Sequence, residues 1–122
     1  MKNVLITGPT GAVGVSLINE LIENGIHVTA VCRPNSKRIN AIPHHDLVDV
    51  VECSLDQLKM LGNRLTHDYD VFYHFAWDGT YGEARQDLYL QTQNIIYTLD
   101  AVHLASEIGC KVFIGAGSQS EF

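Results

Sequence analysis

Three glycines at intervals of three residues, Gly8, Gly11 and Gly14, follow the apolar run Val4-Leu5-Ile6 near the start of the chain. Glycine permits a tight turn and lets an anion approach the backbone, and a third glycine lets a helix pack closely on a strand. A helical apolar pattern begins inside the triplet, so the free N–H groups of its first turn can face an anion. The order of strand, glycine loop and helix predicts a dinucleotide diphosphate site, with a purely structural turn as the alternative. The expected cofactor contacts of this segment are Thr7, Gly8, Thr10, Gly11, Ala12, Val13 and Gly14.

The end of the second predicted strand indicates which dinucleotide is bound. NAD sites place an acidic residue there, about 20 positions after the first glycine, to bind the adenosine ribose. No Asp or Glu lies between His27 and Ala41, whereas Arg33 ends the strand and Ser36 follows it. A guanidinium can hold a 2′-phosphate through two hydrogen bonds, and a hydroxyl adds a donor. The sequence therefore favours NADP and leaves NAD possible. The alternative is that Arg33 belongs to a basic loop that is merely solvated.

Apolar runs and helical patterns alternate along the chain. Strands are expected at residues 3–7, 26–32, 47–53, 70–76 and 111–116, and helices at 11–24, 54–61 and 83–108. Gly25 and Gly109 should end the first and last helices, and Ser54 should cap the second. Such alternation implies parallel strands joined by right-handed crossovers, and near-continuous apolar strands imply burial on both faces. We expect an α/β fold, a doubly wound parallel sheet of five strands in the order 3-2-1-4-5.

Composition narrows the classes of function. The chain has 122 residues, of which 46% are hydrophobic, and this fits one domain with a real core. A net charge of −6 without a basic run argues against nucleic acid as a partner. No apolar stretch is long enough to span a membrane, and three cysteines show no metal-ligand spacing. We expect reduced thiols, no metal, no signal peptide and a cytoplasmic protein.

Four segments resemble the extended short-chain dehydrogenase/reductases, which include sugar-nucleotide epimerases and dehydratases. Residues 7–14 resemble the family's Thr-Gly-x-x-Gly-x-x-Gly, and residues 73–76, Tyr-His-Phe-Ala, resemble its fourth-strand ending His-x-Ala. Asn94, with Thr98 four residues later, is similar to Asn-x-x-Gly-Thr, although Tyr97 replaces the glycine. Residues 113–122 resemble the fifth-strand segment that carries a catalytic Ser or Thr before an aromatic residue. The resemblance covers essentially the whole chain.

The resemblance implies a Rossmann fold and assigns further roles. Phe75, Ala76 and Asn94 would contact the cofactor, Leu55 would lie against adenine, and Ser118 would be the catalytic hydroxyl that binds the reacting oxygen. The implied reaction passes hydride to and from the nicotinamide during epimerisation, dehydration or reduction of a nucleotide-linked sugar. His74 could be catalytic, but its place at a strand end favours packing and positioning.

The same resemblance bears on how much of the enzyme the sequence contains. The family's acid/base Tyr-x-x-x-Lys follows the fifth strand, and residues 1–122 contain no such motif. We therefore expect 1–122 to be the cofactor-binding domain of a longer enzyme, inactive alone. A non-catalytic NADP-binding sensor of the same fold is the alternative. The predicted helix 83–108 carries apolar residues around more than one face, so we expect it to bury two faces. The resemblance implies that one of these faces packs against a second subunit, and we therefore expect a homodimer through this helix. Its apolar residues are Leu88, Leu90, Ile95, Ile96, Leu99, Val102, Leu104, Ala105 and Ile108.

Overall fold

The computed structural model describes residues 2–65, 68–76 and 88–115. Its elements in chain order are β1 (Asn3–Thr7), α1 (Ala12–Glu23), β2 (His27–Cys32), the 3-10 helix η1 (Ile39–Ala41), β3 (Val48–Glu52), the 3-10 helix η2 (Leu55–Arg64), β4 (Val71–His74), α2 (Leu88–Glu107) and β5 (Val112–Gly115). The strands form one parallel sheet in the order β3-β2-β1-β4-β5. The predicted α/β fold and its strand order are confirmed.

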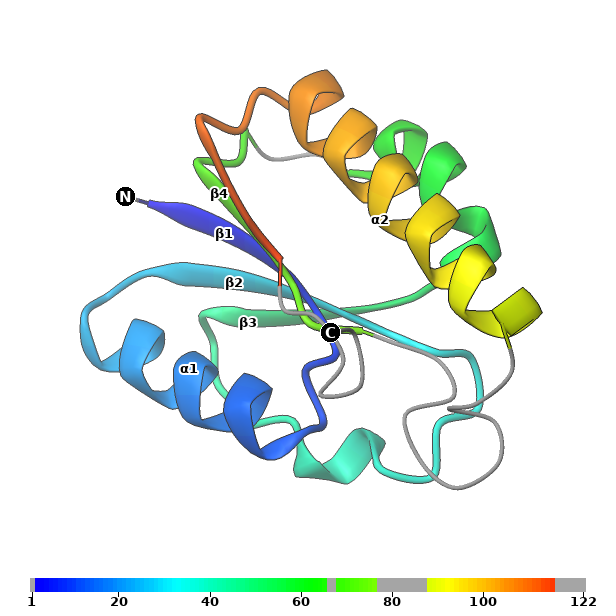
Figure 1. Ribbon diagram of the computed structural model, residues 1–122. Coiled ribbons are helices and arrows are strands. Elements are labelled where there is room, and N and C mark those ends of the chain that lie inside the picture. Colours follow the sequence, from blue (N-terminus) through cyan, green and yellow to red (C-terminus); the bar gives the residue numbers. More distant parts are fainter. Residues whose placement is uncertain (1, 66–67, 77–87, 116–122) are drawn as a thin grey trace.

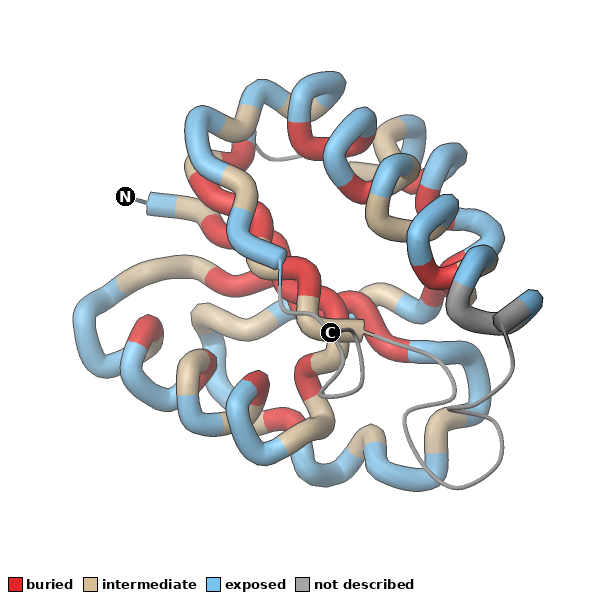
Figure 2. The backbone as a smooth tube through the Cα atoms, in the orientation of Figure 1, coloured by how far each residue is buried: buried red, intermediate tan, exposed pale blue. Residues whose placement is uncertain are grey.

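The sheet lies between two helical layers, with α1 on one face and η2 and α2 on the other (Figure 1). Successive strand residues point to opposite faces, so β1 contributes to two cores. Val4 and Ile6 share a core with Ile18 and Leu21 of α1, whereas Leu5 belongs to the core formed with η2 and α2. The buried residues accordingly follow the central strands and the inner sides of the helices (Figure 2).

The expected burial of every strand on both faces is wrong for the two outer strands. Val50 of β3 exposes 44% of its surface, and Val112 and Ile114 of β5 expose 47% and 42%. Each outer strand has a neighbour on one side only, and α1 packs over β2 rather than over β5. In this sheet an apolar strand sequence therefore indicates parallel pairing, but it does not show that helices cover both faces of the strand.

Two glycines end helices as expected, because Gly25 and Gly109 adopt φ values of +72° and +81° after α1 and α2. Ser54 is the N-cap residue of η2, as predicted, but its side chain makes no capping hydrogen bond. Its hydroxyl donates to Asp56 Oδ1 at 2.5 Å and makes no bond to the helix backbone, and the helix that follows is of the 3-10 type and reaches Arg64. The hydroxyl is instead oriented toward the Asp56 carboxylate, a charged acceptor for its proton. The expected start of the last helix, 83–87, and the end of the last strand, at Ala116, lie outside the described residues.

Helix α2 presents two different faces. Its inward face packs on η2 and the sheet through buried side chains, namely Asn94, Ala101, Leu104 and Ala105. On the opposite face Ile95, Leu99 and Val102 expose 58%, 63% and 45% of their surface. The outer face is thus apolar and uncovered by the described part of the chain.

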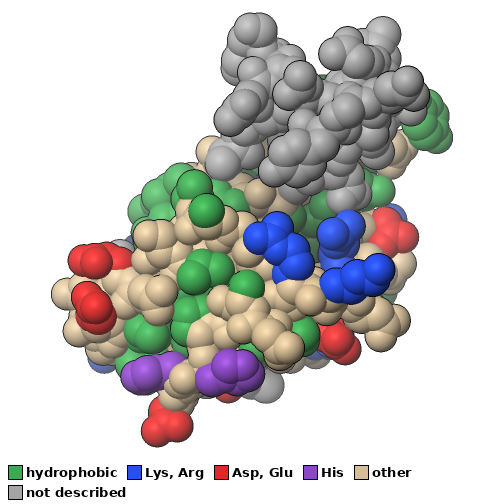
Figure 3. Space-filling view, turned by 90° about the horizontal axis from the view of Figure 1, so that it is seen from below, with side chains coloured by type: hydrophobic (Ala, Val, Ile, Leu, Met, Phe, Trp, Pro, Cys, Tyr) green, Lys and Arg blue, Asp and Glu red, His purple; other side chains and the backbone are tan. Residues whose placement is uncertain are grey.

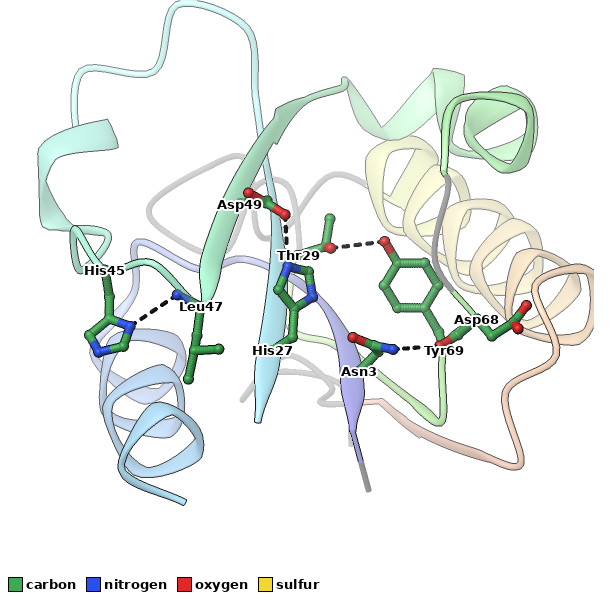
Figure 4. Close-up of polar contacts among 8 residues, drawn as sticks. All are labelled: Asn3, His27, Thr29, His45, Leu47, Asp49, Asp68 and Tyr69. Carbon is green, nitrogen blue, oxygen red and sulfur yellow. Dashed lines mark hydrogen bonds and ion pairs between the residues drawn. The ribbon is translucent and has the colours of Figure 1, made fainter. Parts of the chain in front are cut away.

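Polar side chains join different segments of the chain near the amino ends of the strands (Figure 4). Thr29 Oγ1 and Tyr69 Oη lie 2.8 Å apart in the interior, and His27 Nε2 lies 2.7 Å from Asp49 Oδ2 across β2 and β3. These contacts hold the sheet together at the end away from the carboxyl ends of the strands. The opposite end carries the candidate site.

Candidate cofactor site

A cleft of about 850 Å³ opens at the carboxyl ends of β1 to β4. Ligands of open parallel sheets bind in this position, where the chain connections diverge. The cleft is formed by the loop after β1, the turn after β2, the residues after β3 and the residues after β4. The predicted contacts that line it are Thr7, Gly8, Thr10, Gly11, Arg33, Ser36, Leu55, Phe75 and Ala76.

The glycine loop is fixed by close backbone contacts. Gly8 has a φ of +68°, and a Cβ there would lie 2.8 Å from Ala76 N. A Cβ on Gly14 would overlap the carbonyl oxygen of Gly8, whereas one on Gly11 would meet only that oxygen, at 3.9 Å. The first and third glycines are therefore required by packing, and the second borders the open cleft.

Four of the predicted cofactor contacts do not line the cleft. Ala12 and Val13 are exposed in the first turn of α1, and Gly14 is buried beneath the loop. In that first turn the backbone N–H groups have no partner within the helix, so any contact with an anion would come from the backbone. Asn94 is buried in α2, with 1% of its surface exposed. The predicted catalytic Ser118 lies outside the described residues.

The turn after β2 gives the cleft a cationic rim. Ser36 N donates to the carbonyl of Arg33 at 3.2 Å, and Asn35, after Pro34, has a φ of +60°. Proline followed by a residue of positive φ is typical of a type II turn. Arg33 lines the cleft together with Lys37 and Arg38, and Lys and Arg side chains gather on one face of the molecule (Figure 3). No Asp or Glu is among the described residues that line this cleft.

The inner wall between the ends of β2 and β3 is apolar. Val31, Cys32, Cys53 and Leu55 line the cleft there, and all four are buried. Burial raises the pKa of the Cys32 and Cys53 thiols, so both are neutral at pH 7. The wall suits one face of a flat, uncharged ring. Sequence reasoning identified Leu55 alone, although the positions of the others at strand ends beside the glycine loop could have identified them.

A buried threonine and histidine connect the loops after β1 and β4. Thr7 Oγ1 lies 2.8 Å from His74 Nδ1, and the amides of Phe75 and Ala76 both donate to this oxygen at 3.1 Å. His74 exposes 1% of its surface and does not line the cleft. Burial lowers the pKa of His74 to about 4, so its ring is neutral at pH 7. The buried place of the ring agrees with packing and positioning.

The described part of the chain offers neither a metal site nor a membrane-spanning helix. Among residues 2–65, 68–76 and 88–115, no group of His, Cys, Asp and Glu side chains is placed to hold a metal ion. Within these ranges no helix has the length and apolar character needed to cross a membrane.

Comparison with known proteins identifies the family to which the chain belongs. The sequence profile of the NAD dependent epimerase/dehydratase family matches residues 4–122. The chain belongs to this family. The predicted resemblance to NAD-dependent epimerases and dehydratases is therefore confirmed. A search among curated proteins finds no match.

Solved structures of similar proteins share the fold of this NAD-dependent epimerase/dehydratase chain. UDP-glucose 4-epimerase of Thermotoga maritima, solved with UDP-glucose, is 25% identical with a TM-score of 0.75, and the match covers 93% of this chain and 37% of that protein. The Bordetella bronchiseptica enzyme WbmF, in complex with NAD+, is 25% identical with a TM-score of 0.77, covering 99% of this chain and 38% of that one. An epimerase from Methanothermobacter thermautotrophicus is 22% identical with a TM-score of 0.76, covering 97% and 35%. The chain thus spans little more than a third of each protein's length.

Proposed function

We propose that this chain binds a nicotinamide dinucleotide in the cleft, with NADP preferred over NAD, as the cofactor-binding domain of a longer epimerase, dehydratase or reductase. One observation carries the proposal: a glycine loop at a helix N-terminus and a turn with three cations border the same cleft of about 850 Å³. The WbmF structure, which holds NAD+, supports the class of ligand. The preference for NADP is supported by the turn of this chain, in which Arg33 stands where NAD sites have an acidic residue.

The proposed assignment follows the cleft from end to end. Backbone N–H groups of residues 8–14 would hold the diphosphate at the start of α1. Arg33 and Ser36 would bind the 2′-phosphate, and Leu55 would contact adenine. Phe75 and Ala76 would lie nearer the nicotinamide, and Asn94 of α2 would be a further cofactor contact. When bound, the nicotinamide supplies hydride transfer, for which the domain provides the orientation.

The substrate and the catalytic residue are proposed through the family. A nucleotide-linked sugar is supported by the Thermotoga maritima enzyme, whose structure holds UDP-glucose. Ser118 would donate a hydrogen bond to the reacting oxygen of the sugar. The acid/base pair would come from a Tyr-x-x-x-Lys motif, which residues 1–122 lack. Turnover is therefore expected of the longer protein and not of this chain alone. Three free cysteines support the proposal of a reducing, cytoplasmic compartment.

A homodimer through α2 is the proposed assembly. The outer face of the helix exposes Ile95, Leu99 and Val102, whereas the inner face already covers the sheet and η2. Contiguous apolar patches of this kind are typical of protein interfaces. A second copy of the helix offers the same apolar face, so a twofold interface would bury both.

Calorimetric titration of the 122-residue chain with NADP+ and NAD+ tests the proposed cofactor. Wild type should bind NADP+ more tightly, and Arg33→Ala should weaken it by about 1.5–3 kcal/mol, the usual size of a charge-assisted hydrogen bond. The variant should bind NAD+ almost as wild type does. Lys59→Ala is the control, because Lys59 is an exposed cation of η2 that does not line the cleft. Equal wild-type affinities for both nucleotides, or an equal loss for both in Arg33→Ala, would refute the preference.

A further inference from the structure

The hydroxyl of Thr7 has three polar contacts, and it can act as the donor in only one of them. The backbone amides of Phe75 and Ala76 both donate to Thr7 Oγ1 at 3.1 Å, and His74 Nδ1 lies 2.8 Å from the same oxygen. A hydroxyl has one proton to donate and two lone pairs to accept with. Because the two amides use the lone pairs, the hydroxyl proton must be donated to His74 Nδ1. This nitrogen is therefore an unprotonated acceptor.

The state of the imidazole follows from that assignment. A neutral ring that accepts at Nδ1 carries its proton on Nε2. The ring lies edge-on to Phe72 at 5.9 Å and stacks on Phe113 at 6.2 Å between centroids, an apolar setting that disfavours a charged ring. Nε2 is buried and has no hydrogen-bond partner within the part of the chain that the structure describes.

A buried N–H that has no partner among residues 2–65, 68–76 and 88–115 requires a physical reason, because burying it costs free energy that an apolar ring would not. Phenylalanine would fill a similar space between Phe72 and Phe113 without that cost. What His74 has and phenylalanine lacks is an acceptor at Nδ1, and that acceptor faces Thr7. The histidine is thus explained by its effect on the threonine hydroxyl.

The hydroxyl in turn holds together two walls of the cleft. Phe75 and Ala76 line the cleft, and their amides are bound to Thr7, the last residue of β1. Phe75 N also donates to the Thr7 carbonyl at 3.2 Å. Gly8 follows directly and lies so close to Ala76 N that a Cβ would approach it to 2.8 Å. The Thr7 hydroxyl therefore adds two bonds to the backbone contacts that set the spacing of the loops after β1 and β4, and it is the acceptor for the Ala76 amide.

We infer that His74 is a positioning residue: by accepting the Thr7 hydroxyl proton at Nδ1, it keeps Thr7 Oγ1 oriented to bind the Phe75 and Ala76 amides and so preforms the cleft before nucleotide binds. The effect on nucleotide affinity rests on the proposed function. The protonation of the ring and the protection of the amides do not, because both are measured without nucleotide.

The first experiment reads the ring and the amides in the nucleotide-free 122-residue chain by NMR. Long-range 1H–15N correlations should show the Nε2–H tautomer of His74, and an Nδ1–H tautomer overturns the proposal without any variant. Thr7→Val and His74→Phe should each speed amide hydrogen exchange at Ala76 by about tenfold or more, and by less at Phe75, whose amide also donates to the Thr7 carbonyl. His74→Asn should restore slow exchange, because its carboxamide oxygen can accept near the place of Nδ1.

The matched control is Thr29→Val, which removes another buried threonine hydroxyl of the same sheet, bonded to Tyr69 at 2.8 Å, at the far end from the cleft. In this variant the amide exchange rates of Phe75 and Ala76 should not rise relative to those of the β4 amides. Faster exchange in Thr7→Val but not in His74→Phe overturns the proposal, as does failure of His74→Asn to differ from His74→Phe.

The second experiment measures NADP+ affinity of the same variants. Loss of a preformed cleft should raise the Kd by up to about tenfold in Thr7→Val and His74→Phe, with recovery in His74→Asn. If wild type binds neither NADP+ nor NAD+, the proposed function fails while the NMR results still decide the role of His74. If wild type binds and His74→Phe binds equally well, the preforming role is overturned.

Discussion

Alanine at Gly14 tests whether the glycine loop is fixed by backbone contact. Its Cβ would overlap the Gly8 carbonyl oxygen and lie 3.0 Å from Pro9 Cα. Backbone atoms cannot rotate away, so we place the overpacking cost at the upper end of its usual range, about 3 kcal/mol. Alanine regains about 1 kcal/mol over glycine within a helix. The free energy of unfolding should therefore fall by about 2 kcal/mol, or roughly 6–10 °C in Tm for a chain of this size.

Urea and thermal unfolding followed by circular dichroism measure the effect, with Gly11→Ala as the control. A Cβ on Gly11 meets only the Gly8 carbonyl oxygen, at an ordinary 3.9 Å. Its cost should stay within about 1 kcal/mol, which reflects the weaker preference for alanine at a helix N-cap. The reasoning is refuted if Gly14→Ala is as stable as wild type, or if Gly11→Ala is the more harmful of the two.

Three further predictions concern protonation, assembly and catalysis. Burial lowers the pKa of His74 from 6.5 to about 4, so the folded state binds fewer protons between these values. The free energy of unfolding should have its full value above pH 6.5 and should fall by ~3 kcal/mol as the pH falls to 4. In urea titrations, His74→Asn should lack this pH-dependent loss, and an unchanged pH dependence in the variant would contradict the prediction. In sedimentation velocity at tens of micromolar concentration the wild-type chain should be a dimer, and a monomeric wild type would refute the interface. Leu99→Glu on the outer face of α2 should make the chain monomeric, whereas Val50→Glu on β3 should not. In the longer protein, Ser118→Ala should lower kcat by about 10²–10³-fold in steady-state assays with little change in cofactor affinity, and normal turnover would rule out its proposed role.

The sheet could be predicted from sequence because its determinants are local. Each strand is a short apolar run, and Gly25 and Gly109 mark helix ends through φ values that other residues rarely adopt. The parallel order follows from alternation of strands and helices, which restricts the topology to a few choices. The glycine loop and Arg33 could be placed at one cleft because both follow strands whose carboxyl ends share an edge of the sheet.

Features that depend on distant neighbours could not be predicted in the same way. Exposure of Val112 and Ile114 depends on what lies over an outer strand, and the sequence of the strand does not contain that information. Ser54 occupies the predicted N-cap position, but the orientation of its hydroxyl toward the Asp56 carboxylate depends on side-chain geometry that cannot be read from sequence. The state of His74 depends on Thr7, which is 67 positions away in sequence and 2.8 Å away in space.

The cations of the turn after β2 belong to a chain whose net charge is −6. An approaching dinucleotide is itself an anion, so the protein as a whole repels it at long range, and Arg33, Lys37 and Arg38 attract it only nearby. At physiological salt, charges are screened beyond about 8 Å, which suppresses the distant repulsion more than contacts at the rim. Added salt thus reduces the long-range repulsion between the protein and the nucleotide, and it also weakens the short-range attraction by the cations of the rim. The association rate of the nucleotide should consequently vary less with ionic strength than that of a ligand drawn to a uniformly basic protein.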